Sequence, residues 1–173
     1  MDGLDGLLIG SIFIIISTSA IFLNLSYPIL FIILGSLLSF LIFNIYPAKI
    51  FMGDVGSVFL GCLFSGITFQ ATDIQSFISI LLLGTHLYAD TLTTILRRFL
   101  NNQNILIAHK LHLFQRLKEA GWHQKKITAL YTFSSFMICF SLIRFGLIGE
   151  IITSIIALLS GFYIDKKYAV NLK

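Results

Sequence analysis

The stretch GLLIGSIFIIISTSAIFLNLSYPILFIILGSLLSFLIFNIYPA, residues 6–48, contains no Asp, Glu, Lys or Arg. A hydrocarbon core of about 30 Å is crossed by about 20 helical residues. The stretch is therefore long enough for two crossings, which we expect at Leu7 to Leu25 and at Tyr27 to Tyr46. Residues 24–28 (NLSYP) lie between them, and their polar side chains and proline suit a turn. The stretch predicts two transmembrane helices joined by a short loop.

The rest of the chain has the same character. Of its 173 residues, 57% are hydrophobic and 12% charged, and its mean hydropathy is +0.92. This composition predicts an all-α, polytopic integral membrane protein, with residues 1–173 forming a single transmembrane domain. Four more charge-poor intervals predict further spans, for a total of about six: Val55 to Thr72, Ile74 to Leu96, Ile127 to Ile143 and Leu147 to Ile164.

The basic residues support this count of spans. Lys and Arg collect in the cytoplasmic loops of membrane proteins. With the first residues in the cytoplasm, six crossings place every one of the 12 Lys and Arg residues except Arg144 on that side. An odd number of crossings would separate the basic tail from the other basic segments. The pattern predicts that the polar loops, and with them any catalytic loops, are cytoplasmic, and it explains the positive charge without a nucleic-acid partner.

The first polar motif lies between the second and third predicted spans, at residues 47–57 (PAKIFMGDVGS). Asp54 stands between two glycines, which let the backbone approach a ligand closely. A carboxylate oxygen also suits Mg²⁺, whose usual partners are one or two carboxylates and the phosphates of a substrate. The alternative is an ordinary Gly-Asp turn between two helices.

The second polar motif is residues 1–7 (MDGLDGL). Asp2 and Asp5 are three residues apart, so on a helix they share one face. We expect both at the mouth of the first span, close to the Asp54 loop. The alternative is a charged helix cap, because a carboxylate is favourable at a helix N-terminus.

The third polar segment, residues 97–126, holds seven Lys and Arg residues against one acid, Glu119. Such a loop attracts phosphates or anionic headgroups, although the preference for basic cytoplasmic loops explains most of its charge. His109 and His112 are three apart and are expected on one face of a helix, where they can donate hydrogen bonds to phosphate. A zinc site is not expected, because no cysteine lies nearby.

Together these segments resemble the polyprenyl-phosphate N-acetylhexosamine-1-phosphate transferases, the glycosyltransferase family 4 enzymes of bacterial O-antigen and capsule assembly. The resemblance rests on residues 1–7, on residues 47–57 and on residues 88–117, which match the histidine-bearing loop of the family. It covers only the C-terminal half of the family's fold, because the earlier spans, an upstream asparagine and an upstream Asp-Asp motif have no counterpart here.

The resemblance implies a reaction. An N-acetylamino-sugar 1-phosphate passes from a uridine-diphosphate sugar, such as UDP-N-acetylglucosamine, to undecaprenyl phosphate, giving undecaprenyl-diphosphate-sugar and UMP. This is the first step of cell-envelope polysaccharide assembly, including lipopolysaccharide O-antigen, and implies a site on the cytoplasmic face of the bacterial inner membrane.

The resemblance also assigns candidate residues. The catalytic candidates are Asp2, Asp5 and Asp54. Asp54 is the expected ligand of Mg²⁺, whereas Asp2 and Asp5 either bind the metal or accept a proton from the lipid phosphate. The matching positions for substrate binding are His109, His112, Arg116, Lys49, Gly53 and Ser57.

Two other functions compete with this one. The chain is either active as described or is a catalytically incomplete fragment, one half of a split transferase that needs the missing N-terminal helices; a second copy is a further possible partner. A transporter would place ionisable residues near the middle of the bilayer, whereas here the motifs gather at one face. Asp90 is expected either to orient the histidine loop or to pair with Arg97 or Arg98, and His86 to make an interhelical hydrogen bond.

Overall fold

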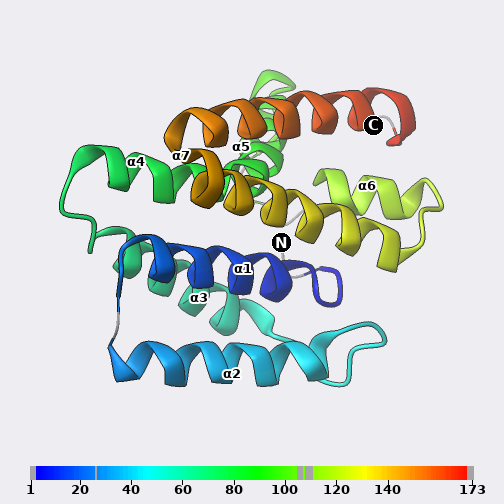
Figure 1. The fold of residues 1–173 in the computed structure, drawn as a ribbon. Coiled ribbons are helices and arrows are strands. Elements are labelled where there is room, and N and C mark those ends of the chain that lie inside the picture. The colour runs from blue at the N-terminus through cyan, green and yellow to red at the C-terminus, as the bar shows by residue number, and fades with distance from the viewer. Residues whose placement is uncertain (1–2, 26, 105–106, 108–110, 171–173) are drawn as a thin grey trace.

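The computed structural model describes residues 3–25, 27–104, 107 and 111–170, and every regular element in these ranges is an α-helix (Figure 1). The prediction of an all-α protein is therefore confirmed. The helices are α1 (Leu7–Phe22), α2 (Pro28–Asn44), α3 (Gly53–Thr68), α4 (Ile74–Leu83), α5 (Thr85–Leu100), α6 (Leu113–Glu119) and α7 (Gln124–Tyr168).

Helix α1 forms the centre of the structure. It packs against α2, α3 and α7, and its side chains Leu7, Ile9, Ile15 and Ile16 are at most 1% exposed. The outer faces of α2 and α7 also carry many large apolar side chains that remain exposed. A water-soluble monomer rarely exposes so much apolar surface, so the exterior matches the composition of a membrane protein.

The lengths of the helices bear on the number of spans. By length and composition, α7 is long and apolar enough to cross a membrane, and α4 with α5 is a second candidate if the bent pair counts as one span. Helices α1, α2 and α3 are apolar but shorter, with 16, 17 and 16 residues. The predicted apolar segments are thus helical, while six crossings remain a prediction.

The fourth predicted span, Ile74 to Leu96, is not one straight helix. Helices α4 and α5 meet at Gly84 and are bent by 69°. A Cβ atom on Gly84 would lie 2.7 Å from the Tyr88 ring, so this ring packs directly against the backbone at the bend. The prediction missed the bend because hydropathy reports how apolar a segment is and not the course of its axis.

Helix α7 contains a sharp reversal at Gly146, with φ 66° and ψ −161°. The chain turns back there, and the two arms run in opposite directions (Figure 1). The arms correspond to the fifth and sixth predicted spans. The reversal brings the end of the second arm, including Asp165, back toward α6.

Replacement of Gly146 should weaken this reversal. Its φ and ψ fall in a region that is essentially restricted to glycine, and other residues there cost about 1–3 kcal/mol. We expect Gly146→Ala to lower the midpoint of thermal unfolding in detergent. Gly161→Ala is the control, because Gly161 lies within the helix and a Cβ there would meet open space. Equal changes in the unfolding midpoint for the two variants would contradict the requirement for glycine at position 146.

Candidate active site

Hydrogen bonds join two of the predicted motifs, residues 1–7 at the start of α1 and residues 47–57 in the loop after α2. Gly6 has φ +73° and precedes α1, and its N–H donates to Asn44 Oδ1 at 3.0 Å. The Asn44 amide in turn donates to the carbonyl of Ile50 at 2.7 Å. Asn44 is buried at the end of α2, so one side chain fixes two of the predicted motifs to each other.

Asp5 makes the same connection with its carboxylate. Oδ2 accepts a hydrogen bond from the Ala48 N–H at 3.0 Å, and the Asp5 carbonyl accepts one from the Thr128 hydroxyl at 2.9 Å. The expectation that Asp5 lies beside the Asp54-bearing loop is confirmed. Asp5 lies in a turn before Leu7, so the argument from a shared helix face was wrong for this residue, and Asp2 lies outside the described residues.

Asp54 lies in the first turn of α3 and is exposed. Gly53 before it has φ +65°, and a Cβ on Gly56 would lie 2.4 Å from Met52 Cγ. The positive φ favours glycine at position 53, whereas at position 56 a Cβ would require the Met52 side chain to move. The Ser57 hydroxyl donates to the Asp54 carbonyl at 3.0 Å.

The donor set near Asp54 is suited to Mg²⁺ only if a substrate contributes. The described part of the chain contains no group of three or more His, Cys, Asp or Glu side chains placed to hold a metal ion. An exposed carboxylate with hard oxygen atoms nevertheless fits a Mg²⁺ ion that is also bound by substrate phosphates. Lys49 is also exposed, and its N–H donates to the Phe43 carbonyl at 2.9 Å.

His112 caps the start of α6. Its backbone N–H donates to Gln115 Oε1 at 3.2 Å, its ring stacks on that of Phe114 with centroids 5.6 Å apart, and its Nδ1 lies 3.5 Å from Asp90 Oδ1. The residue has extended backbone angles and precedes the helix. Its expected place on a helix face was therefore wrong, and His109 lies outside the described residues.

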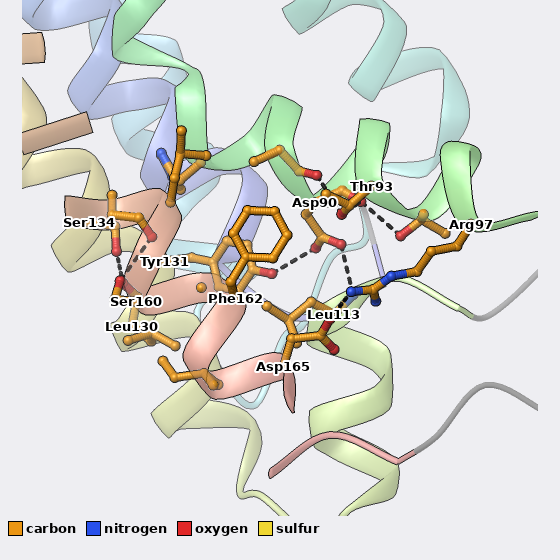
Figure 2. Close-up of a pocket in the computed structure, with 17 residues that line it drawn as sticks. Asp90, Thr93, Arg97, Leu113, Leu130, Tyr131, Ser134, Ser160, Phe162 and Asp165 are labelled. Carbon is orange, nitrogen blue, oxygen red and sulfur yellow. Dashed lines mark hydrogen bonds and ion pairs between the residues drawn. The ribbon is translucent and has the colours of Figure 1, made fainter. Parts of the chain in front are cut away.

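Asp90 orients the loop that carries His112. Its carboxylate accepts hydrogen bonds from the Leu113 N–H and from the Tyr131 hydroxyl, each at 2.7 Å, and Figure 2 shows these groups converging on it. The first expectation for Asp90 is thus confirmed. Arg97, an expected partner of Asp90, pairs with Asp165 instead.

Asp165 joins α7 to both α5 and α6. It accepts from Arg97 and from Arg116, and Arg116 Nε donates to the Val170 carbonyl at 2.8 Å. Arg116, an expected substrate-binding residue, is buried in this arrangement. The roles of Asp165 and Tyr131 were not predicted from the sequence, because their partners are distant along the chain. For Asp165, the only signal was its position before two lysines at the end of an apolar span.

The Tyr131 hydroxyl should contribute measurably to stability. A hydrogen bond to a charged group contributes about 1.5–3 kcal/mol, so we expect Tyr131→Phe to lower the free energy of unfolding by an amount in that range. Tyr163→Phe is the control, since Tyr163 is exposed and bonds only to Lys167 among the described residues. Thermal unfolding in detergent measures both, and a change no larger than that of the control would contradict this role for Tyr131.

The first motif also contacts α6. A Cβ on Gly3 would lie 3.1 Å from Phe114 Cε2 and 3.5 Å from Gln115 Nε2. The turn at residues 3–6 therefore lies between the loop after α2 and the helix that follows the histidine segment. We call these three segments together the motif junction.

A groove opens beside the motif junction. It has a volume of about 510 Å³, and Asp5, Lys125 and Thr128 lie at its polar part. The remainder is lined mostly by apolar side chains of α1 and α2, such as Phe13 and Leu41. Lys125 also lies over the Tyr46 ring, 5.3 Å from its centroid.

The fold and the site define an apolar helical protein in which the Asp5 turn contacts both the loop that leads to Asp54 and helix α6, which follows the histidine segment. Residues 1–72 match the family model described as "Glycosyl transferase family 4". The chain is therefore related to the family 4 glycosyl transferases, and the resemblance predicted from its motifs is confirmed. No solved structure matches the chain.

Curated proteins of similar sequence also point to the family 4 glycosyl transferases. The chain is 37% identical over 142 residues to the "Probable undecaprenyl-phosphate N-acetylglucosaminyl 1-phosphate transferase" of Bacillus subtilis, covering 76% of this chain and 39% of that protein. It is 32% identical over 149 residues to the "Phospho-N-acetylmuramoyl-pentapeptide-transferase" of Clostridium perfringens, covering 80% of this chain and 45% of that protein. The chain thus spans less than half the length of these relatives.

Proposed function

We propose that the chain carries part or all of a transferase site that moves an N-acetylamino-sugar 1-phosphate from a UDP-sugar to undecaprenyl phosphate. The observation that carries the proposal is the motif junction, in which the Asp5 turn bonds to the loop before Asp54 and packs against α6. Both quoted relatives are named for transfer of a phosphorylated amino sugar. UDP-N-acetylglucosamine is the first donor to test.

In the proposed reaction, an oxygen of the lipid phosphate attacks the phosphorus that carries the sugar, and the bond from that phosphorus to UMP breaks. One diphosphate linkage forms as another is lost. A phosphate monoester is largely ionised at neutral pH, so a base is helpful and not essential. Asp5, already held by the Ala48 N–H, would position the loop and accept any remaining proton.

Asp54 is the proposed ligand of Mg²⁺, together with the donor's phosphates. When bound, the ion supplies positive charge that offsets the negative charge developing on the transferring phosphoryl group. Gly53 and Gly56 would keep the carboxylate exposed at the start of α3, where the helix N-terminus also favours an anion. Lys49 and Ser57 belong to the same loop and helix turn and are proposed to bind the donor.

His112 and Arg116 are proposed to bind phosphate oxygens of the donor. His112 lies at the N-terminal end of α6, while Arg116 is held by Asp165 and the Val170 carbonyl. Arg116 would therefore reach a substrate only by sharing its guanidinium with Asp165. His109 is also proposed to bind the donor, because of its position in the matching motif.

We further propose that the chain crosses the bacterial inner membrane about six times, with the motif junction in the cytoplasm. The exposed apolar surface and the distribution of Lys and Arg support this topology. The groove beside Asp5 supports a lipid substrate, because its lining combines a carboxylate and an ammonium group with mostly apolar side chains.

The test is transfer of radiolabelled N-acetylglucosamine 1-phosphate from UDP-N-acetylglucosamine to undecaprenyl phosphate by the purified chain, with Mg²⁺ or with EDTA. We expect labelled lipid only with Mg²⁺. A parallel reaction supplies the N-terminal half of the Bacillus subtilis relative in trans, and product only in this reaction would favour the split-enzyme alternative. Absence of product with several UDP-N-acetylamino sugars in both reactions would contradict the proposal.

A further inference from the structure

A buried carboxylate lies far from the motif junction. Glu150 is 0% exposed, on the second arm of α7 shortly after the reversal at Gly146. Apart from Ser79, its carboxylate oxygens have no hydrogen-bond partner among the described residues. Figure 1 places the reversal of α7 and the neighbouring α4 at the end of the structure away from the start of α1. The proposed transfer reaction does not use this residue.

Three buried serines lie on the segments next to this carboxylate. Ser79 on α4 lies beside it, and Ser154 is one helical turn farther along the same arm. Ser141, on the first arm, approaches the neighbouring Gly149, where a Cβ would lie 3.0 Å from its Oγ. All three hydroxyls are buried; those of Ser141 and Ser154 have no hydrogen-bond partner in the part of the chain that the structure describes, and that of Ser79 has none other than Glu150.

These serines differ from most helical Ser and Thr residues of this protein. The usual arrangement here is a bond to a carbonyl three or four residues earlier, as in Ser17 to Phe13 at 2.7 Å and Thr153 to Gly149 at 3.0 Å. Ser79, Ser141 and Ser154 do not make that bond. Their oxygen lone pairs, with those of Glu150, are therefore available to another group.

The charge of the cluster limits what that group can be. No Lys, Arg or His side chain pairs with Glu150 among the described residues, and the titratable group near it on the first arm is the Cys139 thiol, which is close to Thr18 of α1. An unpaired buried charge is strongly unfavourable. A single positive charge with a preference for oxygen ligands would balance one carboxylate and also use the three hydroxyls.

We propose that Glu150, Ser79, Ser141 and Ser154 form a buried binding site for one Na⁺ ion. The ion links α4 to both arms of α7 and so stabilises the reversal at Gly146. A proton alone would neutralise Glu150 but would leave two or more of the hydroxyls unpaired. A divalent ion would leave a net positive charge buried with one carboxylate.

The proposal is tested by the effect of Na⁺ on the thermal unfolding of the purified chain in detergent at pH 9, where protons compete least for the carboxylate. Ionic strength is held constant by replacing NaCl with choline chloride or KCl. Since a ligand that binds only the folded state stabilises it, we expect the unfolding midpoint to rise by about 5 °C in NaCl relative to choline chloride, and by less in KCl. Broadening of the ²³Na NMR signal by the protein measures binding directly.

Variants separate this site from a general salt effect. Glu150→Gln keeps the shape of the side chain and should abolish both the Na⁺-dependent shift and the broadening. Ser154→Ala should require about tenfold more Na⁺ for the same shift, and it keeps the test available if Glu150→Gln fails to fold. Ser160→Ala is the control, because its exposed hydroxyl bonds to the Ala157 carbonyl at 2.9 Å. Equal midpoints in NaCl, KCl and choline chloride, or a midpoint that depends on pH alone, would overturn the proposal.

Discussion

Asp54→Asn should lower the Mg²⁺-dependent rate of sugar-phosphate transfer by at least about 100-fold. Charge stabilisation by a catalytic metal ion contributes several kcal/mol, and about 1.4 kcal/mol corresponds to a tenfold change in rate. Asparagine retains the size of aspartate and its ability to occupy the first turn of α3, but it binds Mg²⁺ weakly. The measurement is the initial rate of labelled lipid formation as Mg²⁺ is varied, in the form of the enzyme that turns over.

Asp73→Asn is the matched control for this change. Asp73 is an exposed acid at the start of another helix, α4, and it accepts a hydrogen bond from the Ser76 N–H at 2.8 Å. Bonds from Ser76 lower the pKa of its carboxyl group, so it is ionised under the conditions of the assay. Because asparagine is an equally good N-cap, this variant should retain the parent rate within about threefold. A similar rate for both variants would contradict the proposed role of Asp54 as a Mg²⁺ ligand.

Asp165→Asn should produce the largest loss of stability among these variants, about 3 kcal/mol or more. Removal of one partner of a buried ion pair leaves an uncompensated charge and costs about 3–5 kcal/mol. The Asp165 side chain is 10% exposed and the Arg116 side chain 7%, so water cannot replace the lost carboxylate. Thermal unfolding in detergent gives the global effect, and limited proteolysis between α5 and α6 reports the release of α6.

Glu119→Gln controls for the loss of one negative charge at the same end of the protein. Glu119 is exposed at the end of α6, and exposed ion pairs contribute at most about 1 kcal/mol. If Asp165→Asn were no more destabilising than Glu119→Gln, the pairing of Asp165 with the two arginines would not stabilise the fold.

The sequence predicted the helical class, the positions of the apolar segments and the contact between the Asp5 turn and the loop that leads to Asp54. These features follow from charge-free intervals and from local motifs. The bend at Gly84 was not predictable in the same way, because it depends on how the Tyr88 ring packs against the backbone. The reversal at Gly146 was implied by the two predicted spans on either side of it.

The polar contacts behind the motifs were less accessible to sequence analysis. Asn44 belongs to a stretch whose other residues indicate only a transmembrane helix, yet its amide connects Gly6 to Ile50. Likewise, Tyr131 lies 41 residues from its partner Asp90. A pattern based on spacing along one helix cannot identify contacts that are created by packing of several helices.

The position of Asp165 also constrains the order of events during biosynthesis. Its two arginine partners are 68 and 49 residues earlier in the chain, and a polypeptide emerges from the ribosome N-terminal end first. Helix α6 is therefore synthesised well before the carboxylate that neutralises Arg116. Until the second arm of α7 has been synthesised and has folded back, Arg116 lacks the carboxylate with which it pairs in the folded chain.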